Sequence, residues 1–201
     1  ALSCTNCHST HEKGADAGAP DRPEHIDTCL SCHGEFKGQV ALAAHTRHEP
    51  GQTSCLDCHM PRIVQGFSVY NRTHRISSPS EPAILTSGMP NACNLCHLNK
   101  SLVWTRDALA TGWGKRVELL PHLTKIFGVD LRRATGSAWL EHPFSMARTV
   151  VSGAYARSSF GMAALPKLLP HLNENNAYVR LRFLQDIERI IGRALTRDEY
   201  D

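Results

Sequence analysis

The chemistry of this chain is carried by four short segments that share one spacing, Cys-x-x-Cys-His. They are Cys4-Thr5-Asn6-Cys7-His8, Cys29-Leu30-Ser31-Cys32-His33, Cys55-Leu56-Asp57-Cys58-His59 and Cys93-Asn94-Leu95-Cys96-His97. Two thiols at this spacing can form thioethers with the two vinyl groups of one porphyrin, and the histidine that follows can ligate its iron. The sequence therefore predicts four covalently bound haem c groups. Each is anchored by the two cysteines of its segment, with His8, His33, His59 or His97 as the proximal ligand.

Cysteine pairs of this kind also build zinc sites and disulfide frameworks, but neither demands a histidine after every pair. Histidine makes up 12 of the 201 residues. Four histidines would follow four pairs by chance with a probability of about one in 10⁵. The histidines therefore favour haem.

The second axial ligand of each iron separates electron carriers from haem enzymes. Five further histidines lie in the same half of the chain: His11, His25, His45, His48 and His74. His11 lies only three residues from His8, at most about 10 Å even in an extended chain, so it is too close to complete the same iron. We expect it to ligate a neighbouring haem.

His45 and His48 are also only three residues apart, so we expect them to ligate two different irons. His74 lies fifteen residues after His59 and can reach the iron of another motif. The predicted distal ligands are His11, His45, His48 and His74, with His25 kept as a substitute. Methionine can also ligate haem iron. Met60 directly follows His59 and cannot reach the opposite face of its own haem, and Met89 stays open as a ligand that is not needed.

The segment that holds the motifs offers little apolar periodicity, and the motifs are 25, 26 and 38 residues apart. We therefore expect residues 1–103 to form a loop-rich tetrahaem domain with short helices at the motifs. The porphyrins would supply its apolar mass, so its folding should depend on haem attachment.

The second half predicts helices, with apolar residues spaced by three and four and with Gly or Pro between them. The expected helices run from Ser101 to Gly112, Arg116 to Phe127, Pro143 to Ser158, Met162 to Leu172 and Ala177 to Gly192. In the last helix one apolar stripe is expected, made of Val179, Phe183, Ile187, Ile190 and Ile191. Residues 173–176 would form the turn and the cap before it. The fold class is mainly α with little or no β, and residues 104–201 are expected to form a HEAT-like helical domain.

This helical domain has two interpretations: it docks a partner, or it packs against the haem block as a structural wing. Basic side chains could form a face for an acidic partner or for haem propionates, although a run of charges on a helix is usually just solvated. These side chains are Arg180, Arg182, Arg189, Arg193 and Arg197. The expected partners are redox proteins, and self-assembly or docking into a larger complex is a further prediction.

The charge balance argues against nucleic acid as a partner. The chain carries 22 Lys and Arg against 19 Asp and Glu, a formal charge of +3, without dense basic clusters. The sequence contains no apolar run long enough to cross a membrane, and we expect any signal segment to have been removed before residue 1. With covalent haem, this predicts a periplasmic or extracellular location.

The stretch from Cys4 to about Trp104 resembles the C-terminal haem block of bacterial multihaem cytochromes that carry tetratricopeptide or HEAT-like repeats. These are related to the doubled-CxxCH and pentahaem nitrite reductase cytochromes. The matching segments are CTNCHSTH, HTRH followed by CLDCHMPR, RTHRISSP and PNACNLCHLNKS. The resemblance places His11, His45, His48 and His74 at positions of distal ligands. Larger relatives carry further haems upstream of this block.

The related nitrite reductases use a lysine as the proximal ligand of the catalytic haem, whereas all four motifs here end in histidine. The predicted function is therefore an electron carrier that relays electrons through four bis-histidine haems and is not an enzyme. Two alternatives stay open. One is an oxidoreductase in which a haem with an open position acts on a small nitrogen or oxygen species. The other is a subunit of an extracellular cytochrome filament.

Overall fold

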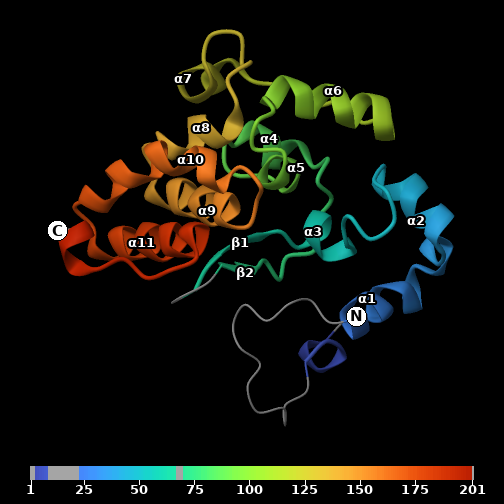
Figure 1. The fold of residues 1–201 in the computed structure, drawn as a ribbon. Coiled ribbons are helices and arrows are strands. Elements are labelled where there is room, and N and C mark those ends of the chain that lie inside the picture. The colour runs from blue at the N-terminus through green and yellow to red at the C-terminus, as the bar shows by residue number, and fades with distance from the viewer. Residues whose placement is uncertain (1–2, 9–22, 67–69, 201) are drawn as a thin grey trace.

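The computed structural model describes residues 3–8, 23–66 and 70–200, and helices dominate it (Figure 1). The only sheet in these ranges is a hairpin of β1 (Arg62–Gln65) and β2 (Tyr70–Arg72), paired antiparallel. The predicted fold class, mainly α with little β, is confirmed. No helix in the described part of the chain is both long and apolar enough to cross a membrane.

The half that carries the motifs consists of short helices joined by loops. Its elements are η1 (Cys4–Asn6), α1 (Pro23–Cys32), η2 (Gly34–Phe36), α2 (Gln39–Thr46), α3 (Cys55–His59), α4 (Pro82–Thr86) and α5 (Ala92–Cys96). Each Cys-x-x-Cys pair lies within or beside one of these helices, as the sequence predicts. In three motifs the histidine N–H donates to the carbonyl of the first cysteine, which closes one helical turn. These bonds are His8 to Cys4 (2.9 Å), His33 to Cys29 (3.0 Å) and His97 to Cys93 (3.0 Å).

Local capping explains why such short helices form. In α3 the Asp57 carboxylate accepts from the backbone N–H and the hydroxyl of Ser54, at 2.8 and 3.0 Å. In α5 the Asn91 side chain accepts from the backbone N–H of Asn94 at 3.0 Å. Polar side chains at an N-cap satisfy N–H groups that have no partner within the helix.

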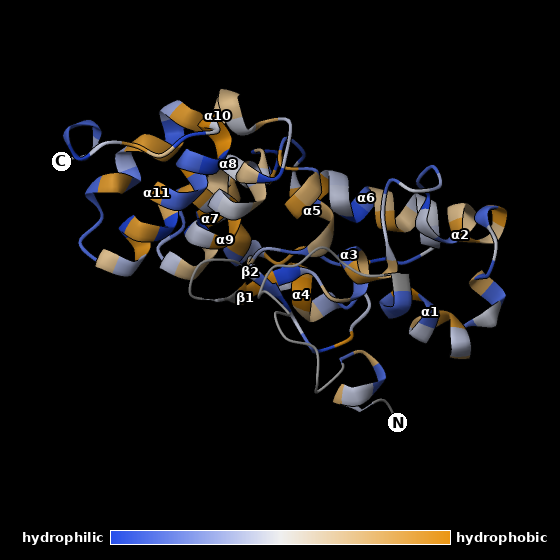
Figure 2. Ribbon diagram, turned by 60° about the horizontal axis from the view of Figure 1, so that its bottom comes forward, coloured by the Kyte–Doolittle hydropathy of each residue, from blue (hydrophilic) through white to orange (hydrophobic). Residues whose placement is uncertain are grey.

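The second half is a packed helical body. Its elements are α6 (Leu102–Trp113), η3 (Pro121–Leu123), α7 (Thr124–Phe127), α8 (Thr135–Leu140), α9 (Ser145–Ala156), α10 (Gly161–Leu168), η4 (Leu169–Asn173), α11 (Ala177–Ile191) and η5 (Arg197–Glu199). Helix α9 packs against both α8 and α11. Fully buried side chains such as Trp139, Val151 and Phe183 fill this core, and in Figure 2 apolar colour alternates with polar colour around these helices.

The helices predicted from Ser101 to Gly112, Pro143 to Ser158 and Ala177 to Gly192 are present with bounds shifted by at most two residues. The helix predicted from Met162 to Leu172 is α-helical only to Leu168, where the 3-10 helix η4 follows. The predicted helix from Arg116 to Phe127 is wrong in its first half, because Pro121 starts a 3-10 turn and helix α7 begins only at Thr124. Helix α8 was not expected. Before α11, the Asn176 side chain accepts from the N–H groups of Tyr178 and Val179, which confirms the predicted cap.

The apolar stripe of α11 is confirmed at its centre, where Val179, Phe183 and Ile187 are buried. The suggested basic face is wrong at Arg182, whose side chain is fully buried next to Asp186. A helix can bury such a pair only when the charges compensate each other. Arg180 and Arg193 stay on the surface.

The predicted boundary at residues 103 and 104 lies inside helix α6. One buried cluster runs from Tyr70 and Leu85 to Phe183 and Ile187, so the packing is continuous across that position. At Gly88, which has a φ of 74°, the chain passes so close to the second half that a Cβ would lie 2.9 Å from Ile126. The two-domain division stays a prediction.

Candidate haem-binding site

The four motifs are neighbours in space in the order in which they occur in the chain. The first two are joined by Thr28, whose hydroxyl donates to the carbonyl of Asn6 at 3.0 Å. Helix α3 of the third motif packs against α1 of the second and α5 of the fourth. In Figure 1, α1, α2 and α3 occupy one side of the molecule and α8 to α11 the other. The cysteines and histidines therefore form one connected region.

The histidine of the third motif faces His45. The centroids of the His59 and His45 rings are 6.1 Å apart and their planes differ by 9°. Nδ1 of His59 lies 2.9 Å from the carbonyl oxygen of Ser77, so Nδ1–H donates there and Nε2 is left as the metal-binding nitrogen. Burial, together with His59, lowers the pKa of His45 and so favours the neutral imidazole that can ligate a metal.

The histidine of the fourth motif faces His48 in the same manner. The His97 and His48 centroids are 5.9 Å apart, with 30° between the ring planes. Nδ1 of His48 is 2.7 Å from the carbonyl oxygen of Thr46, which again leaves Nε2 available. Burial, and after it the neighbouring His48, lowers the pKa of His97.

The histidine of the first motif has two neighbours. The His8 ring centroid lies 6.1 Å from that of His74 and 5.9 Å from that of His25. His25 directs Nε2 to the carbonyl oxygen of Cys7 at 3.1 Å. This hydrogen bond occupies Nε2 of His25, the nitrogen that His48 and His59 leave available, and so the arrangement favours His74 as the facing ligand.

The histidine of the second motif faces no other histidine among the described residues. His33 is 65% exposed, and its ring stacks against Phe36 at 6.3 Å. The remaining predicted distal ligand, His11, lies outside the described residues. Three of the four motif histidines therefore lie opposite a second imidazole, and for the fourth the ligand assignment stays a prediction.

These separations fit an iron ion held between two rings. With Fe–N bonds of about 2 Å, and with each nitrogen about 1.1 Å from its ring centroid, trans imidazoles have centroids about 6 Å apart. The three pairs match this value. The Nδ1 hydrogen bonds of His48 and His59 are the orienting contacts that metal-bound imidazoles require. The residues present thus fit haem c.

The thiols fit the same interpretation. All eight cysteines are free in the structure. Burial raises the pKa of Cys93 to about 11 and also raises the pKa of Cys58 and Cys96. In the described ranges, no three His, Cys, Asp or Glu side chains come close enough together to hold a metal ion. The thiols are therefore not arranged as a zinc cluster, whereas pairs on short helices suit thioether attachment.

Arg72 holds the third motif in place, a role that the sequence analysis did not assign. Its guanidinium donates to the carbonyls of Leu56 and Met60 at 2.6 and 3.0 Å and to Asp57 at 2.7 Å. Burial alone would raise the pKa of Asp57, but the hydrogen bonds from Arg72 and Ser54 outweigh it and lower the pKa. Arg72 thus ties the carbonyl end of α3 to the carboxylate that caps its start.

A buried polar network holds the fourth motif. Asn94 is fully buried; its side-chain oxygen accepts from Thr105 at 2.6 Å and from Asn91 at 3.0 Å. Both Asn91 and Asn94 lie in the segment PNACNLCH, so their place beside a motif was visible in the sequence. Their burial was not, because it depends on helix α6.

Two contacts from the end of α6 fix the segment that carries His45 and His48. Trp113 Nε1 donates to the carbonyl of His45 at 2.7 Å, and Arg47 Nε donates to the carbonyl of Gly112 at 2.9 Å. Arg47 itself has a positive φ of 59°, which ends helix α2 between the two histidines. This left-handed residue turns the chain so that His45 and His48 face two different motifs.

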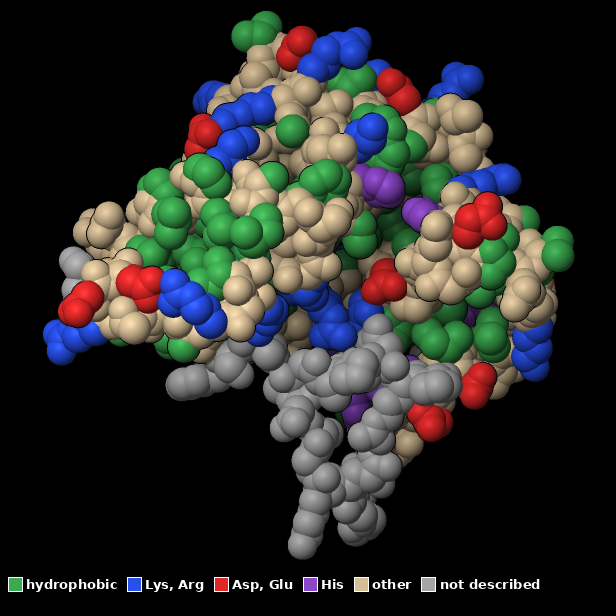
Figure 3. Space-filling model, in the orientation of Figure 1, with side chains coloured by type: hydrophobic (Ala, Val, Ile, Leu, Met, Phe, Trp, Pro, Cys, Tyr) green, Lys and Arg blue, Asp and Glu red, His purple; other side chains and the backbone are tan. Residues whose placement is uncertain are grey.

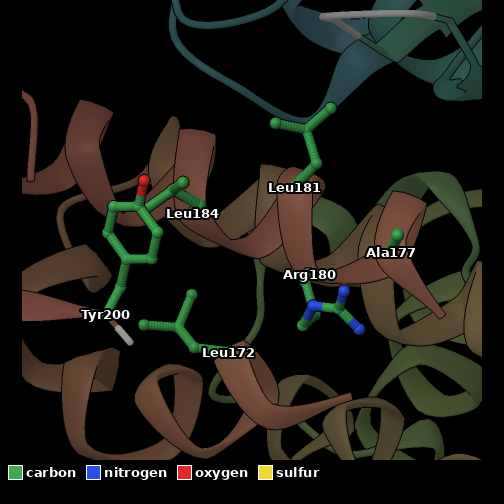
Figure 4. A pocket seen from close by; sticks show the side chains of 6 residues that line it. All are labelled: Leu172, Ala177, Arg180, Leu181, Leu184 and Tyr200. Atoms are coloured by element: carbon green, nitrogen blue, oxygen red, sulfur yellow. The ribbon is translucent and has the colours of Figure 1, made fainter. Parts of the chain in front are cut away.

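A hollow on the far side of the molecule takes no part in this site. It is lined by Leu172, Ala177, Arg180, Leu181, Leu184 and Tyr200, on α11 and the segments beside it (Figure 4). None of the predicted haem-binding residues borders it.

Comparison with known proteins gives one match. Residues 41–119 match the model of the Cytochrome c552 family. This segment is under half of the chain, and it contains the third and fourth motifs together with His45, His48 and His74. No curated protein and no solved structure matches the chain.

The match corrects one prediction. The chain was expected not to be an enzyme, but the Cytochrome c552 family is associated with nitrite reductase activity, so that expectation is overturned. The family implies covalently bound haem c with its iron. Together with the Cys-x-x-Cys-His motifs, the match supports a multihaem c-type cytochrome related to the nitrite reductases.

Proposed function

We propose that this protein carries electrons through four covalently bound haem c groups in an oxidoreductase reaction of the nitrite reductase kind. The observation that carries the proposal is the set of three imidazole pairs, His45 with His59, His48 with His97 and His8 with His74. Their ring centroids are 5.9 to 6.1 Å apart. An iron ligated on both sides is typical of electron-transfer haems.

The chain's own residues would bind the cofactor and orient the ligands of its iron. The two thiols of each motif attach it and the paired imidazoles hold its iron, while the carbonyls of Ser77 and Thr46 orient the rings of His59 and His48. When bound, haem c supplies one-electron oxidation and reduction. The neutral histidines expected from the lowered pKa values of His45 and His97 suit this ligation.

The motif of His33 distinguishes two forms of the function. In the first, His11 completes the iron, and the four haems deliver electrons to an oxidoreductase reaction whose substrate binds on a partner subunit. In the second, that iron keeps an open position and acts on a small nitrogen or oxygen species. The second form is supported by the match to the Cytochrome c552 family, which is associated with nitrite reductase activity.

The proposed function also suggests a cellular location and a role for the helical part of the chain. Cytochrome c552 proteins are typically periplasmic or secreted, and we assign this protein to the same location. We propose that the helices after residue 104 form a HEAT-like domain that docks a redox partner or the next subunit of a filament. The outward-facing hollow beside Tyr200 lies on this part of the chain.

The test is carbon monoxide binding to the reduced protein, combined with electron paramagnetic resonance of the oxidised protein. We expect at least three low-spin irons that do not bind carbon monoxide. In H45A and H48A one further iron should become high-spin and bind carbon monoxide, because each variant removes one axial ligand. Wild-type-like spectra in both variants would contradict the proposed pairs.

Matched variants test which histidine is the distal ligand of the iron at His8 and of the iron at His33. H74A and H25A compare the two neighbours of His8, and only H74A should open an iron. H11A addresses the motif of His33. If wild type already binds one carbon monoxide and H11A changes nothing, the second form of the function holds, and reduction of nitrite by the reduced protein should then be measurable. If H11A creates the carbon monoxide site, the first form holds.

A further inference from the structure

A cluster of arginines surrounds one buried carboxylate between the β hairpin and the helical body. It consists of Arg157 at the end of α9 and Arg182 and Arg189 on α11, which lie near Asp186, together with Arg62 on β1, which lies near Arg157. In Figure 3, which has the orientation of Figure 1, basic side chains gather at the centre of the face, at the level of the β1–β2 hairpin. We call these four residues the arginine cluster.

Tyr70 organises the inner part of the cluster. The Arg182 guanidinium lies 4.3 Å from the centroid of the Tyr70 ring, and its Nε donates to the Tyr70 hydroxyl at 3.3 Å. The Arg157 guanidinium is 6.0 Å from the centroid of the same ring. A side chain at Gly153 would collide with Tyr70, so this glycine lets the ring lie directly under α9.

The charges of the cluster do not balance. Asp186 is fully buried; Arg189 pairs with it at 3.2 Å, and Arg182 lies 4.0 Å away. Three guanidinium groups, those of Arg157, Arg182 and Arg189, thus lie near this one carboxylate. In the described part of the chain, three buried polar atoms here lack any hydrogen-bond partner: Ser152 Oγ, Arg182 Nη2 and Asp186 Oδ2. Buried polar atoms without partners indicate that a further polar group belongs at this place.

Arg157 is the member that can receive such a group. Its side chain is exposed to solvent, and its guanidinium lies over the Tyr70 ring. Desolvation, and after it the neighbouring Arg62 and Arg189, lowers its pKa. Arg157 therefore presents an accessible guanidinium to solvent beside other cations.

The helix that ends at Arg157 adjoins the fourth motif. Helix α5, which carries Cys93 and Cys96, packs against α9, and Arg157 is the residue that follows the last turn of α9. Arg72 is already occupied by Asp57 and two carbonyls. The excess positive charge of the arginine cluster therefore lies beside the region where haem would be attached.

We propose that the arginine cluster, through Arg157, is a carboxylate-binding site that receives a haem propionate. The proposal rests on the proposed function, because it requires haem on the motifs. Arginine is the side chain best suited to a carboxylate, which it can bind with two parallel N–H donors. A propionate of a haem attached to the motifs would be held near Arg157, whereas a free anion must be captured from solution at an entropic cost.

The test compares R157Q and R157K in the full haem-loaded protein, with R116Q, an exposed arginine outside the cluster, as the control. Intact mass gives the number of attached haems, and spectroelectrochemistry gives their reduction potentials. Loss of the cation should disfavour the more negative, reduced haem. We expect R157Q to lower one potential by about 59 mV, which is tenfold in a one-electron equilibrium. R157K and R116Q should stay near wild type with unchanged haem number.

Unchanged potentials in an R157Q protein with its full haem number would overturn the proposal. So would a wild-type potential that shifts saturably with inorganic phosphate at constant ionic strength and loses this shift in R157Q, because the site would then bind a free anion. If R157Q does not fold, R189Q replaces it with the same expected direction. A wild-type mass without haem would instead refute the proposed function, and the two failures are thus distinguishable.

Discussion

The two halves of this chain are held together in different ways. Among the described residues before Tyr70, Leu56 is the only buried apolar side chain, whereas one continuous apolar core extends from Tyr70 to Ile187. The residues before Tyr70 instead carry three of the four motifs, together with His45 and His48, whose rings lie opposite those of His59 and His97. A segment with few buried apolar side chains can thus use a cofactor as its apolar core. The lack of such side chains shows where that segment lies.

The largest expected effect comes from producing the protein without haem, which tests whether the residues before Tyr70 need haem to fold. In protein produced without haem attachment, we expect the segment 23–66 to be cleaved by protease at least about tenfold faster, since it has no apolar core of its own. The core around Phe183 should stay protected. Limited proteolysis with mass spectrometry measures both. Equal protection of the two halves without haem would show that the first half folds on its own.

Removing one large core side chain should affect the second half alone. F183A deletes a fully buried ring from α11 and should lower the free energy of unfolding by about 3–5 kcal/mol. The matched change V40A, at a side chain that is 86% exposed in α2, should change it by less than about 0.5 kcal/mol. Denaturant unfolding of the haem-loaded protein checks both. A large effect of V40A would indicate a core in the first half that packing does not show.

Asp186 makes the stability of the second half depend on pH. Burial raises its pKa to about 6 from 3.8, against the opposing effect of Arg182. Above about pH 6 the fold bears the full cost of the buried charge. As the pH falls from 6 to 3.8, the folded protein takes up the proton first and gains stability. The neighbours that face Asp186 are Arg182, Arg189, Ser152, Arg157 and Tyr70.

D186N removes this titration. Between pH 7 and pH 4, wild type should gain about 2–3 kcal/mol relative to D186N, because two pKa units correspond to about this energy. Urea unfolding at both pH values measures the difference. Groups that titrate in both proteins, such as Glu174, cancel. A constant difference between the two proteins would show that Asp186 has an ordinary pKa.

The smallest expected effect concerns the start of α11. N176A removes the side-chain oxygen that accepts from the N–H groups of Tyr178 and Val179 and should cost about 1 kcal/mol. N175A, one residue earlier, leaves this cap intact and is the control. Thermal unfolding of both variants gives the comparison, and equal midpoints would refute the capping role.

Much of the helical half was predictable because helix signals are local. The apolar stripe of α11 and its Asn176 cap are read directly from spacing. Two features were not local. Arg182 lies in the same helix as the solvent-facing Arg180 but is buried by Tyr70 and Asp186, which come from packing. Helix α8 is too short to show a period of its own.

The site was predictable in its residues but not in its pairs. The motifs predict their own cysteines and proximal histidines, and the short reach between His45 and His48 predicts that they serve different irons. Which motif each one faces depends on the left-handed turn at Arg47 and on the bond from Trp113 to the His45 carbonyl. These contacts join segments more than sixty residues apart in the chain. No local pattern encodes them.

The most direct test of the account is the position of the metal. Anomalous diffraction at the iron absorption edge from crystals of the haem-loaded protein locates each iron ion. The account predicts irons between His45 and His59, between His48 and His97 and between His8 and His74, with a fourth beside His33. Irons away from these pairs, or a zinc signal at the cysteines, would contradict it.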